Sequence, residues 1–279
     1  SFRVKLFCVD TSVNLRECLD KGRSAVFFSA TLLPIRYYKK LLSAEEDYAI
    51  YIASPFPREH RQIMIGTDVS SRYSRRGQEE YEKIYRYIET LTGTRDGNYM
   101  VFFPSYRMLQ DVYAIACAEG LDEQVTLICQ NPNMKEEERE EFLQQFEGEH
   151  VVAFCILGGI FAEGIDLVGE RLIGTIVVGI GLPMVCNERE ILRNYFEERE
   201  GMGFEYAYLY PGMNKVLQAA GRVIRTAEDQ GVILLLDERF LRSSSRQLFP
   251  REWEGYEVVR LDTVAEISEK FWVEQSDRR

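Results

Sequence analysis

The stretch that decides the fold is VVAFCIL, Val151 to Leu157, followed at once by the glycine-rich segment GGIFAEGIDLVG. All of its residues are apolar, so the strand that they predict has no polar side. A strand that alternated apolar and polar residues would indicate one face in water, whereas a continuous apolar run indicates burial on both faces. This pattern is typical of a parallel sheet that helices cover on both sides.

The same pattern recurs along the 279 residues and alternates with stretches that are typical of helices. Further strands are predicted at VKLFCV, AVFFS, YMVFF, VTLIC, GTIVVGI, GVILLL and EVVRL, which begin at Val4, Ala25, Tyr99, Val125, Gly174, Gly231 and Glu257. Helices are predicted over residues 78–90, 105–118, 134–146, 188–199 and 213–225. Such repetition predicts an α/β fold with a doubly wound, mostly parallel sheet and helices on both faces. Ligands of these sheets bind at the carboxyl ends of the strands.

Composition narrows the class of protein. Hydrophobic residues make up 46% of the chain and charged residues 28%, which is typical of a folded soluble domain. The net charge of −11 argues against a surface coated with basic residues for nucleic acid, but it allows a local basic patch. There is no secretory signal, no apolar run that would span a bilayer, and no CxxC pair among the six cysteines. We therefore expect a cytoplasmic protein with no membrane segment and no metal site in this chain.

Near the C-terminal end, the stretch QAAGRVIR, Gln218 to Arg225, places two arginines and a glutamine close together. On a helix, which turns ~100° per residue, Gln218, Arg222 and Arg225 fall within roughly 60° of one another, opposite an apolar face. Two guanidinium groups on a rigid helix suit an oxyanion, because each binds bidentately and keeps its charge. The alternative is a solvated helix face without a ligand.

Two strand ends carry polar residues that are suited to capping. VFFPSYRM, from Val101, places Ser105 at the start of a helix, where it caps the first turn and leaves backbone N–H groups for an anion. GVILLLDERF ends in Asp237 and Glu238, as a magnesium-binding strand would. The chain has no GxxxxGK loop to present a nucleotide phosphate, so a cap on the next turn is favoured over a metal site.

The segment LGGIFAEGIDLVG, from Leu157, combines glycines with carboxylates at the end of a predicted strand. Paired glycines allow backbone N–H groups to approach a phosphate closely, and Glu163 and Asp166 follow them. The spacing differs from the GxGxxG dinucleotide fingerprint, and a tight turn without a ligand is the alternative.

The order of these stretches resembles a known family. SATL at Ser29, VFFPSY at Val101, GGIFAEGID at Gly158 and QAAGRVIR at Gln218 follow one another as the C-terminal motifs of superfamily-two helicases do. DTSVNLRECLDKGRSAVFFSATLLP, DVSSRYSRRGQEEYEKIY and DERF are similar to the XPD/DinG branch, and the resemblance covers almost the whole chain. Gly158 and Ile160 stand where XPD proteins carry basic residues, which makes the DinG type the nearer one.

The resemblance implies a RecA-like fold, with residues 55–279 forming the second of two motor domains. Residues 1–54, which hold the SATL motif, are a lead-in that we expect to form an edge of the same sheet. Family members are ATP-driven motors that move along single-stranded DNA, usually 5′ to 3′, and separate duplexes. The first domain, absent from this chain, would hold ATP with Mg²⁺ and, in many members, an iron–sulfur cluster. We therefore expect a monomeric ATP-dependent DNA helicase of which this chain alone does not turn over ATP.

The resemblance also implies roles for single residues in the ATP site. Arg222 and Arg225 would reach across to the γ-phosphate held by the first domain, and Gln218 would position the nucleotide or the attacking water. Coupling between the ATP cleft and the DNA track would fall to three residues after the Val151 strand, Glu163, Gly164 and Asp166.

Contacts to single-stranded DNA would be mostly to backbone phosphates, because a motor must ignore base sequence. The resemblance places them at Ser105 with its helix N-terminus and at Gly159, and at Arg72 and Arg75 in the polar segment 68–77. The alternative function is a degenerate module that binds nucleic acid or protein without hydrolysis. The intact arginines and glutamine favour the motor, because a module without turnover has no need of them.

Overall fold

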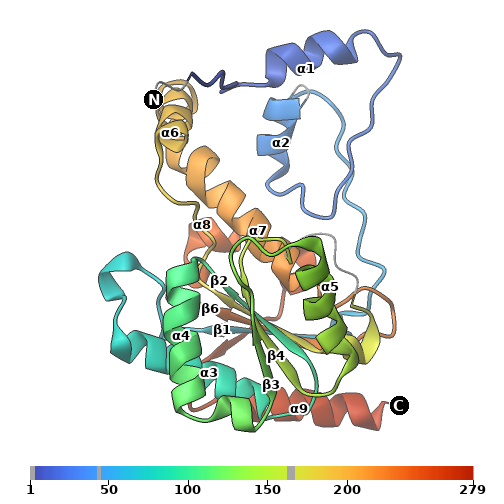
Figure 1. Cartoon of the computed structure of the whole chain (residues 1–279). Helices are drawn as coiled ribbons and strands as arrows, with labels where there is room; N and C mark the ends of the chain where they lie inside the picture. Colours follow the sequence, from blue (N-terminus) through green and yellow to red (C-terminus); the bar gives the residue numbers. More distant parts are fainter. Residues whose placement is uncertain (1–3, 43–44, 162–166, 279) are drawn as a thin grey trace.

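The computed structural model describes residues 4–42, 45–161 and 167–278 and is drawn in Figure 1. Seven parallel strands form one sheet in the order β3-β4-β2-β5-β6-β1-β7. They are β1 (Arg61–Gly66), β2 (Tyr99–Phe103), β3 (Thr126–Cys129), β4 (Val151–Ile156), β5 (Gly174–Val178), β6 (Gly231–Leu236) and β7 (Glu257–Val259). The predicted doubly wound α/β sheet is confirmed, and every strand pair of the described residues is parallel.

Helices cover both faces of this sheet (Figure 1). One face carries α3 (Gln78–Thr92), α4 (Tyr106–Ala118) and α9 (Val264–Asp277), and the other carries α5 (Glu136–Gln144) and α7 (Tyr210–Ala220). Alternate residues of β2 show the division, because Val101 and Phe103 pack with the first set while Met100 and Phe102 pack with the second. All four are fully buried, which is why the strand sequences are continuously apolar.

The remaining helices lie away from the centre of the sheet. They are α1 (Ser12–Leu19), α2 (Ile35–Leu42), α6 (Asn187–Glu200) and the one-turn α8 (Ser243–Arg246). A π-helical turn, Glu205–Leu209, leads straight into α7. Short 3-10 turns occur at Arg58–His60, Tyr73–Arg75, Leu121–Glu123, Gln145–Glu147, Gly169–Arg171, Glu238–Leu241 and Arg251–Trp253. No helix of the described residues is long and apolar enough to cross a membrane.

The described part of the lead-in, residues 4–42 and 45–54, differs from the prediction. VKLFCV and AVFFS form no strand, and the sheet ends at β7 on one side and at β3 on the other, so the expected edge strand from residues 1–54 is wrong for the described residues. Their apolar side chains instead face solvent, with Leu6 at 101% and Phe28 at 89% exposure. Strand propensity alone does not form a strand, because the backbone groups need a neighbouring strand to bond. The division of the chain at residue 54 stays a prediction.

The lead-in contacts α6, the π-helical turn and α7 (Figure 1), and the N–H of Ser54 also donates to Glu252 Oε1 at 3.2 Å. The ring of Tyr37 on α2 packs edge-on against Tyr206 and Tyr210, with centroids 4.9 and 5.1 Å apart. The hydroxyl of Tyr195 on α6 donates to Asp10 Oδ2 at 2.8 Å. These contacts fix the lead-in beside the end of α7 at which Tyr210 lies.

Six of the strands predicted from apolar runs are present, and β1 is an additional strand, as α1, α2, α8 and α9 are additional helices. β1, RQIMIG, opens with Arg61 and Gln62, so it lacks the uninterrupted apolar run that marks the other strands, although its last four residues are buried. It lies between β6 and β7. Its position in the sheet, rather than its own composition, makes it a strand.

Candidate functional site

The predicted site residues fall into two regions of the sheet. Parallel strands place their carboxyl ends at one edge and their amino ends at the opposite edge. The carboxyl edge carries the predicted DNA contacts, which follow β1, β2 and β4: Arg72, Arg75, Ser105 and Gly159. Arg222 and Arg225 instead come just before β6, toward the amino edge. The arginines are therefore not at the carboxyl edge, where we expected ligands to bind.

Ser105 caps helix α4, as predicted. Its hydroxyl accepts from the backbone N–H of Met108 at 3.4 Å. Beside it, the buried Gln130 accepts from the N–H of Ile156 at 2.9 Å and donates to the Tyr106 hydroxyl at 3.1 Å. This glutamine, which no sequence pattern singled out, ties β3, β4 and the first turn of α4 together. The helix N-terminus and the turn after β4 are thereby fixed side by side.

The paired glycines after β4 form a tight turn that α7 covers. Gly158 has φ +72°, and a Cβ there would lie 2.7 Å from Cδ of Lys215, so only glycine fits beneath that side chain. The N–H of Gly159 donates to the Ile156 carbonyl at 2.9 Å, which closes the turn. Lys215 is half-buried, and this burial lowers the pKa of its ammonium group. Lys215 thus brings a cation to this turn from a distant helix, which the sequence pattern did not indicate.

The predicted coupling residues Glu163, Gly164 and Asp166 lie outside the described residues. The chain on either side of them is firmly held. Phe161 stacks on Phe142 of α5, with ring centroids 4.2 Å apart. Eight residues further on, the N–H of Gly169 donates to Asp229 Oδ1 at 3.0 Å. One flank therefore lies near the carboxyl end of β4, and the other is hydrogen-bonded to the loop that carries the arginines.

The helix expected over residues 213–225 begins earlier, at Tyr210, and ends at Ala220, with Gly221 as its C-cap. Gln218 is on the helix, whereas Arg222 and Arg225 follow it in a loop. The prediction that all three share one helical face is wrong. The N–H groups of Arg225 and Thr226 bond to the Asp229 carboxylate instead of to helix carbonyls. Arg222 is 8% exposed and Arg225 is exposed, so the two guanidinium groups have different environments.

Asp229 organises this arginine loop, which we define as residues 221–230. It is 3% exposed and accepts from the N–H groups of Arg225 and Thr226, both at 2.7 Å, and from Thr226 Oγ1 at 2.9 Å. Its fourth donor is the N–H of Gly169, three residues after Asp166. One carboxylate therefore joins the arginine loop to the chain that follows the predicted coupling residues. Burial by itself would raise the pKa of Asp229, but these hydrogen bonds keep it below its ordinary value. Sequence reasoning missed this residue.

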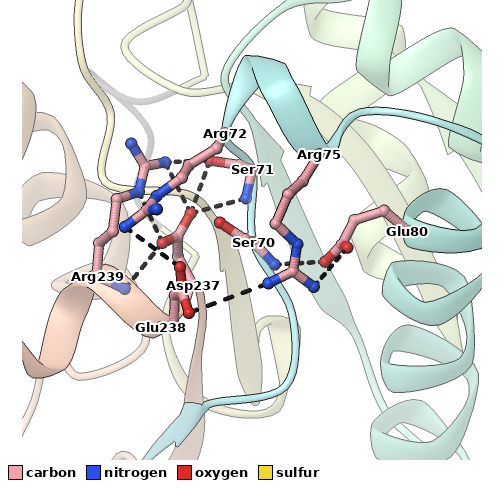
Figure 2. Close-up of polar contacts among 8 residues, drawn as sticks. All are labelled: Ser70, Ser71, Arg72, Arg75, Glu80, Asp237, Glu238 and Arg239. Atoms are coloured by element: carbon pink, nitrogen blue, oxygen red, sulfur yellow. Dashed lines mark hydrogen bonds and ion pairs between the residues drawn. The ribbon is translucent and has the colours of Figure 1, made fainter.

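At the carboxyl edge, Figure 2 shows a second loop held by a buried aspartate. We call residues 67–77 the edge loop. Asp237, at the end of β6, accepts from the N–H and the hydroxyl of Ser71, each at 2.8 Å. It also accepts from the backbone N–H, Nε and Nη2 of Arg239 at 2.8 to 2.9 Å. Burial raises the pKa of Asp237, but the Arg239 guanidinium and these donors bring it below the ordinary value.

These contacts decide between the two interpretations of the Asp237–Glu238 strand end. Five donors, two of them from the Arg239 guanidinium, occupy the oxygens of Asp237, so its lone pairs are engaged by protein groups. The cap on the next turn is confirmed, because the carboxylate accepts from the N–H of Arg239. The described residues also include no cluster of three His, Cys, Asp or Glu side chains that could hold a metal ion.

Arg72 and Arg75 of the edge loop both lie close to carboxylates (Figure 2). Arg72 Nη2 is 3.3 Å from Glu238 Oε1, and Arg75 Nη1 is 4.0 Å from Glu238 Oε2. Arg75 Nη2 also lies 2.8 Å from Glu80 Oε2. Glu80, in the first turn of α3, accepts in addition from the N–H of Ser70. The edge loop thus presents two arginines whose positions are set by contacts within the chain.

Comparison with known proteins identifies the family of this chain. A family model described as helicase C-terminal domain matches residues 88–256, more than half of the chain. The chain is 26% identical to a probable ATP-dependent helicase of Methanocaldococcus jannaschii, over 94% of this chain and 42% of that protein. It is 24% identical to the XPD helicase subunit of general transcription and DNA repair factor IIH from Schizosaccharomyces pombe, over 96% of this chain and 37% of that protein.

Solved structures agree on the fold. A structure described as XPD helicase superposes with a TM-score of 0.70 at 21% identity, over 88% of this chain and 44% of that one. A structure described as XPD apo gives a TM-score of 0.71 at 20% identity, over 90% of this chain and 51% of that one. The chain spans less than half the length of the curated relatives above. The chain belongs to the helicase C-terminal domain family, as an XPD/DinG-type member of superfamily two.

Proposed function

We propose that this chain is the second motor domain of an ATP-dependent DNA helicase, which translocates on single-stranded DNA in the 5′ to 3′ direction and separates duplexes. Relatives over nearly the whole chain are named as helicases, and their greater length leaves room for a first domain. ATP and Mg²⁺ would be held mainly by that first domain, because this chain has no GxxxxGK loop to present a nucleotide phosphate. We further propose a monomeric cytoplasmic protein of the DinG type, whose parent chain carries any iron–sulfur cluster outside these residues.

The observation that carries the proposal is the position of Asp229. It fixes the loop of Arg222 and Arg225 and holds Gly169 with the same carboxylate. A change in the segment between Gly159 and Gly169 would therefore reach the arginines directly. A motor needs such a link between the nucleotide and the nucleic acid, and Glu163, Gly164 and Asp166 belong to that segment.

In this mechanism the arginine loop completes an ATP site formed by another domain. Arg225 is exposed at the surface and would contact the γ-phosphate, and Arg222 would support the same developing charge. Gln218, on the last turns of α7, would orient the nucleotide or the attacking water. The chain alone would then hydrolyse no ATP, because it supplies charge stabilisation but neither the phosphate loop nor the magnesium ligands.

The DNA track is proposed at the carboxyl edge. The backbone N–H groups at the start of α4, next to Ser105, and those of the turn at Gly159 suit phosphate oxygens. Lys215 adds a cation over that turn, while Arg72 and Arg75 lie further along the edge, beyond β5 and β6. All of these groups would contact backbone phosphates, which suits a motor that ignores base sequence.

The decisive experiment measures single-strand-stimulated ATP hydrolysis by the full-length protein that carries this chain, with and without Arg225→Ala. We expect the variant to lose about a hundredfold or more of kcat, ~3 kcal/mol of barrier, while binding of the DNA strand changes little. Arg86→Ala is the matched control, because Arg86 is an exposed arginine on α3, away from both loops. It should hydrolyse ATP like the wild type.

Equal turnover of Arg225→Ala and Arg86→Ala would contradict the motor proposal for these arginines. A wild-type protein that binds single strands but hydrolyses no ATP would favour the alternative function, a binding module without turnover. Turnover by the isolated 279-residue chain would refute the dependence on a first domain.

A further inference from the structure

Glu238 lies between two arginines of the edge loop (Figure 2). Its two carboxylate oxygens face different guanidinium groups, Arg72 at 3.3 Å and Arg75 at 4.0 Å. Two guanidinium groups that converge on one small anion match the geometry of a phosphate, whose oxygens accept from the same planar donors. The carboxylate thus occupies the position that a phosphate would take between these two side chains.

The backbone holds Glu238 and the edge loop in this relation. The N–H of Glu238 donates to the carbonyl of Val69 at 3.0 Å. Next to it, Asp237 binds Ser71, the residue before Arg72. Gly179 at the end of β5 packs against the same serine, since a Cβ at this φ of +80° would lie 2.2 Å from Ser71 Oγ. The two arginines and the carboxylate are therefore presented by anchored backbone.

The three carboxylates of this cluster are not equivalent. Asp237 is fully buried and bonded to five donors, and Glu80 is 7% exposed and bonded to Ser70 and Arg75. Glu238 has a side chain that is 36% exposed, and its ion pairs are longer than that of Glu80. Partly exposed ion pairs of this kind contribute little to stability. Glu238 is the carboxylate that another anion can replace at little cost.

We propose that Glu238 is an internal competitor for the phosphate backbone of single-stranded nucleic acid at the edge loop. In the free protein it occupies Arg72 and Arg75, and a backbone phosphate displaces it when the strand binds. The inference rests on the proposed DNA track, and it adds a residue, Glu238, that sets the affinity of this track for the strand. With a net charge of −11, the chain as a whole repels a polyanion, and the strand is held by local cations. Because Glu238 neutralises two of these cations, Arg72 and Arg75, it limits how tightly the strand is retained. Weak retention suits a protein that must release each phosphate to move on.

The test is binding of a fluorescently labelled oligothymidylate to the 279-residue chain, followed by anisotropy at several salt concentrations. Glu238→Gln keeps the size and removes the charge, so it should lower Kd about three- to tenfold. The plot of log K against log salt should also steepen by ~0.7, the value for one more effective cation on a single strand. Glu257→Gln is the matched control, because it removes one negative charge from the exposed part of β7. It should change Kd less than about twofold.

A second comparison assigns the effect to the arginines. Arg72→Gln with Arg75→Gln should weaken binding and lower the salt slope, and adding Glu238→Gln to that pair should give no further gain. A parallel titration with ATP distinguishes a nucleotide from the strand. If Glu238→Gln tightened ATP and left the oligothymidylate unchanged, the occupant would be a nucleotide and the proposal would be wrong.

Equal affinities of Glu238→Gln and Glu257→Gln, or no binding of the strand by either, would also overturn the proposal. These results are separable from the motor proposal, which depends on ATP turnover and Arg225. If Arg225→Ala abolishes turnover while Glu238→Gln leaves strand binding unchanged, the motor function stands and the role of Glu238 falls.

Discussion

The arginine loop and the edge loop lie toward opposite edges of one sheet, and each is held by a single buried aspartate. Asp229 holds the arginine loop through backbone N–H groups and a threonine hydroxyl, with no guanidinium among the donors that we describe. Asp237 holds the edge loop through the N–H and hydroxyl of Ser71, and its ion-pair partner Arg239 also donates to Ser71 Oγ, at 2.8 Å. The comparison teaches that one buried aspartate can fix a loop backbone with or without an ion pair of its own. Among the bonds that we describe, neither aspartate accepts from the guanidinium group of a functional arginine.

The largest effect should come from removing Asp237. Asp237→Ala leaves the Arg239 guanidinium, whose side chain is only 13% exposed, without its buried partner, so we expect the free energy of unfolding to fall by about 3–5 kcal/mol. Denaturant unfolding measures it. The double variant Asp237→Ala/Arg239→Met should recover part of the loss, because the unpaired charge is gone. A loss below about 1 kcal/mol in the single variant would mean that the ion pair does not anchor the edge loop.

Removing Asp229 should cost less stability but more turnover. Asp229→Ala loses bonds that come from uncharged donors, so we expect unfolding to be easier by about 1–3 kcal/mol. ATP hydrolysis by the full-length protein should fall toward the level of Arg225→Ala, because the arginine loop loses its fixed backbone. Thr226→Val is the matched control, since it removes one of the four bonds and should reduce turnover only slightly. Normal turnover with Asp229→Ala would show that the loop is positioned by other contacts.

The smallest effect is the pH dependence of stability that the two aspartates share. Both have pKa values below the ordinary 3.8, so their contribution to stability is present above that value and is lost as pH falls through the lower, folded-state pKa. The difference in unfolding free energy between wild type and each alanine variant should therefore shrink below about pH 4. Unfolding curves from pH 7 to pH 3 measure it. A difference that stays constant over this range would contradict charged aspartates as the anchors.

Some features could be predicted because a short stretch determines them. Ser105 caps α4 through a bond to a residue three positions away, and Asp237 caps the turn that it begins, so local sequence was sufficient for both. The strand from Val151 could be predicted from burial on two faces. Features that depend on distant partners were missed or wrong. The expected helix through Arg225 ends at Ala220. The N–H groups of Arg225 and Thr226 bond to the Asp229 carboxylate instead of to helix carbonyls, and this carboxylate also accepts from the N–H of the distant Gly169.

The amino-acid sequence by itself determined the α/β class, the family and the places where loops follow buried strands, because periodicity and motif order are properties of the chain. Only the tertiary structure decided that VKLFCV and AVFFS are not strands of this sheet, since a strand exists only beside a partner. It also decided that Arg72 and Arg75 meet Glu238, more than a hundred and fifty residues away, and that Arg225 depends on a carboxylate shared with Gly169. Ion pairs and hydrogen bonds act over a few ångströms, so the fold and not the spacing in sequence determines which groups can form them.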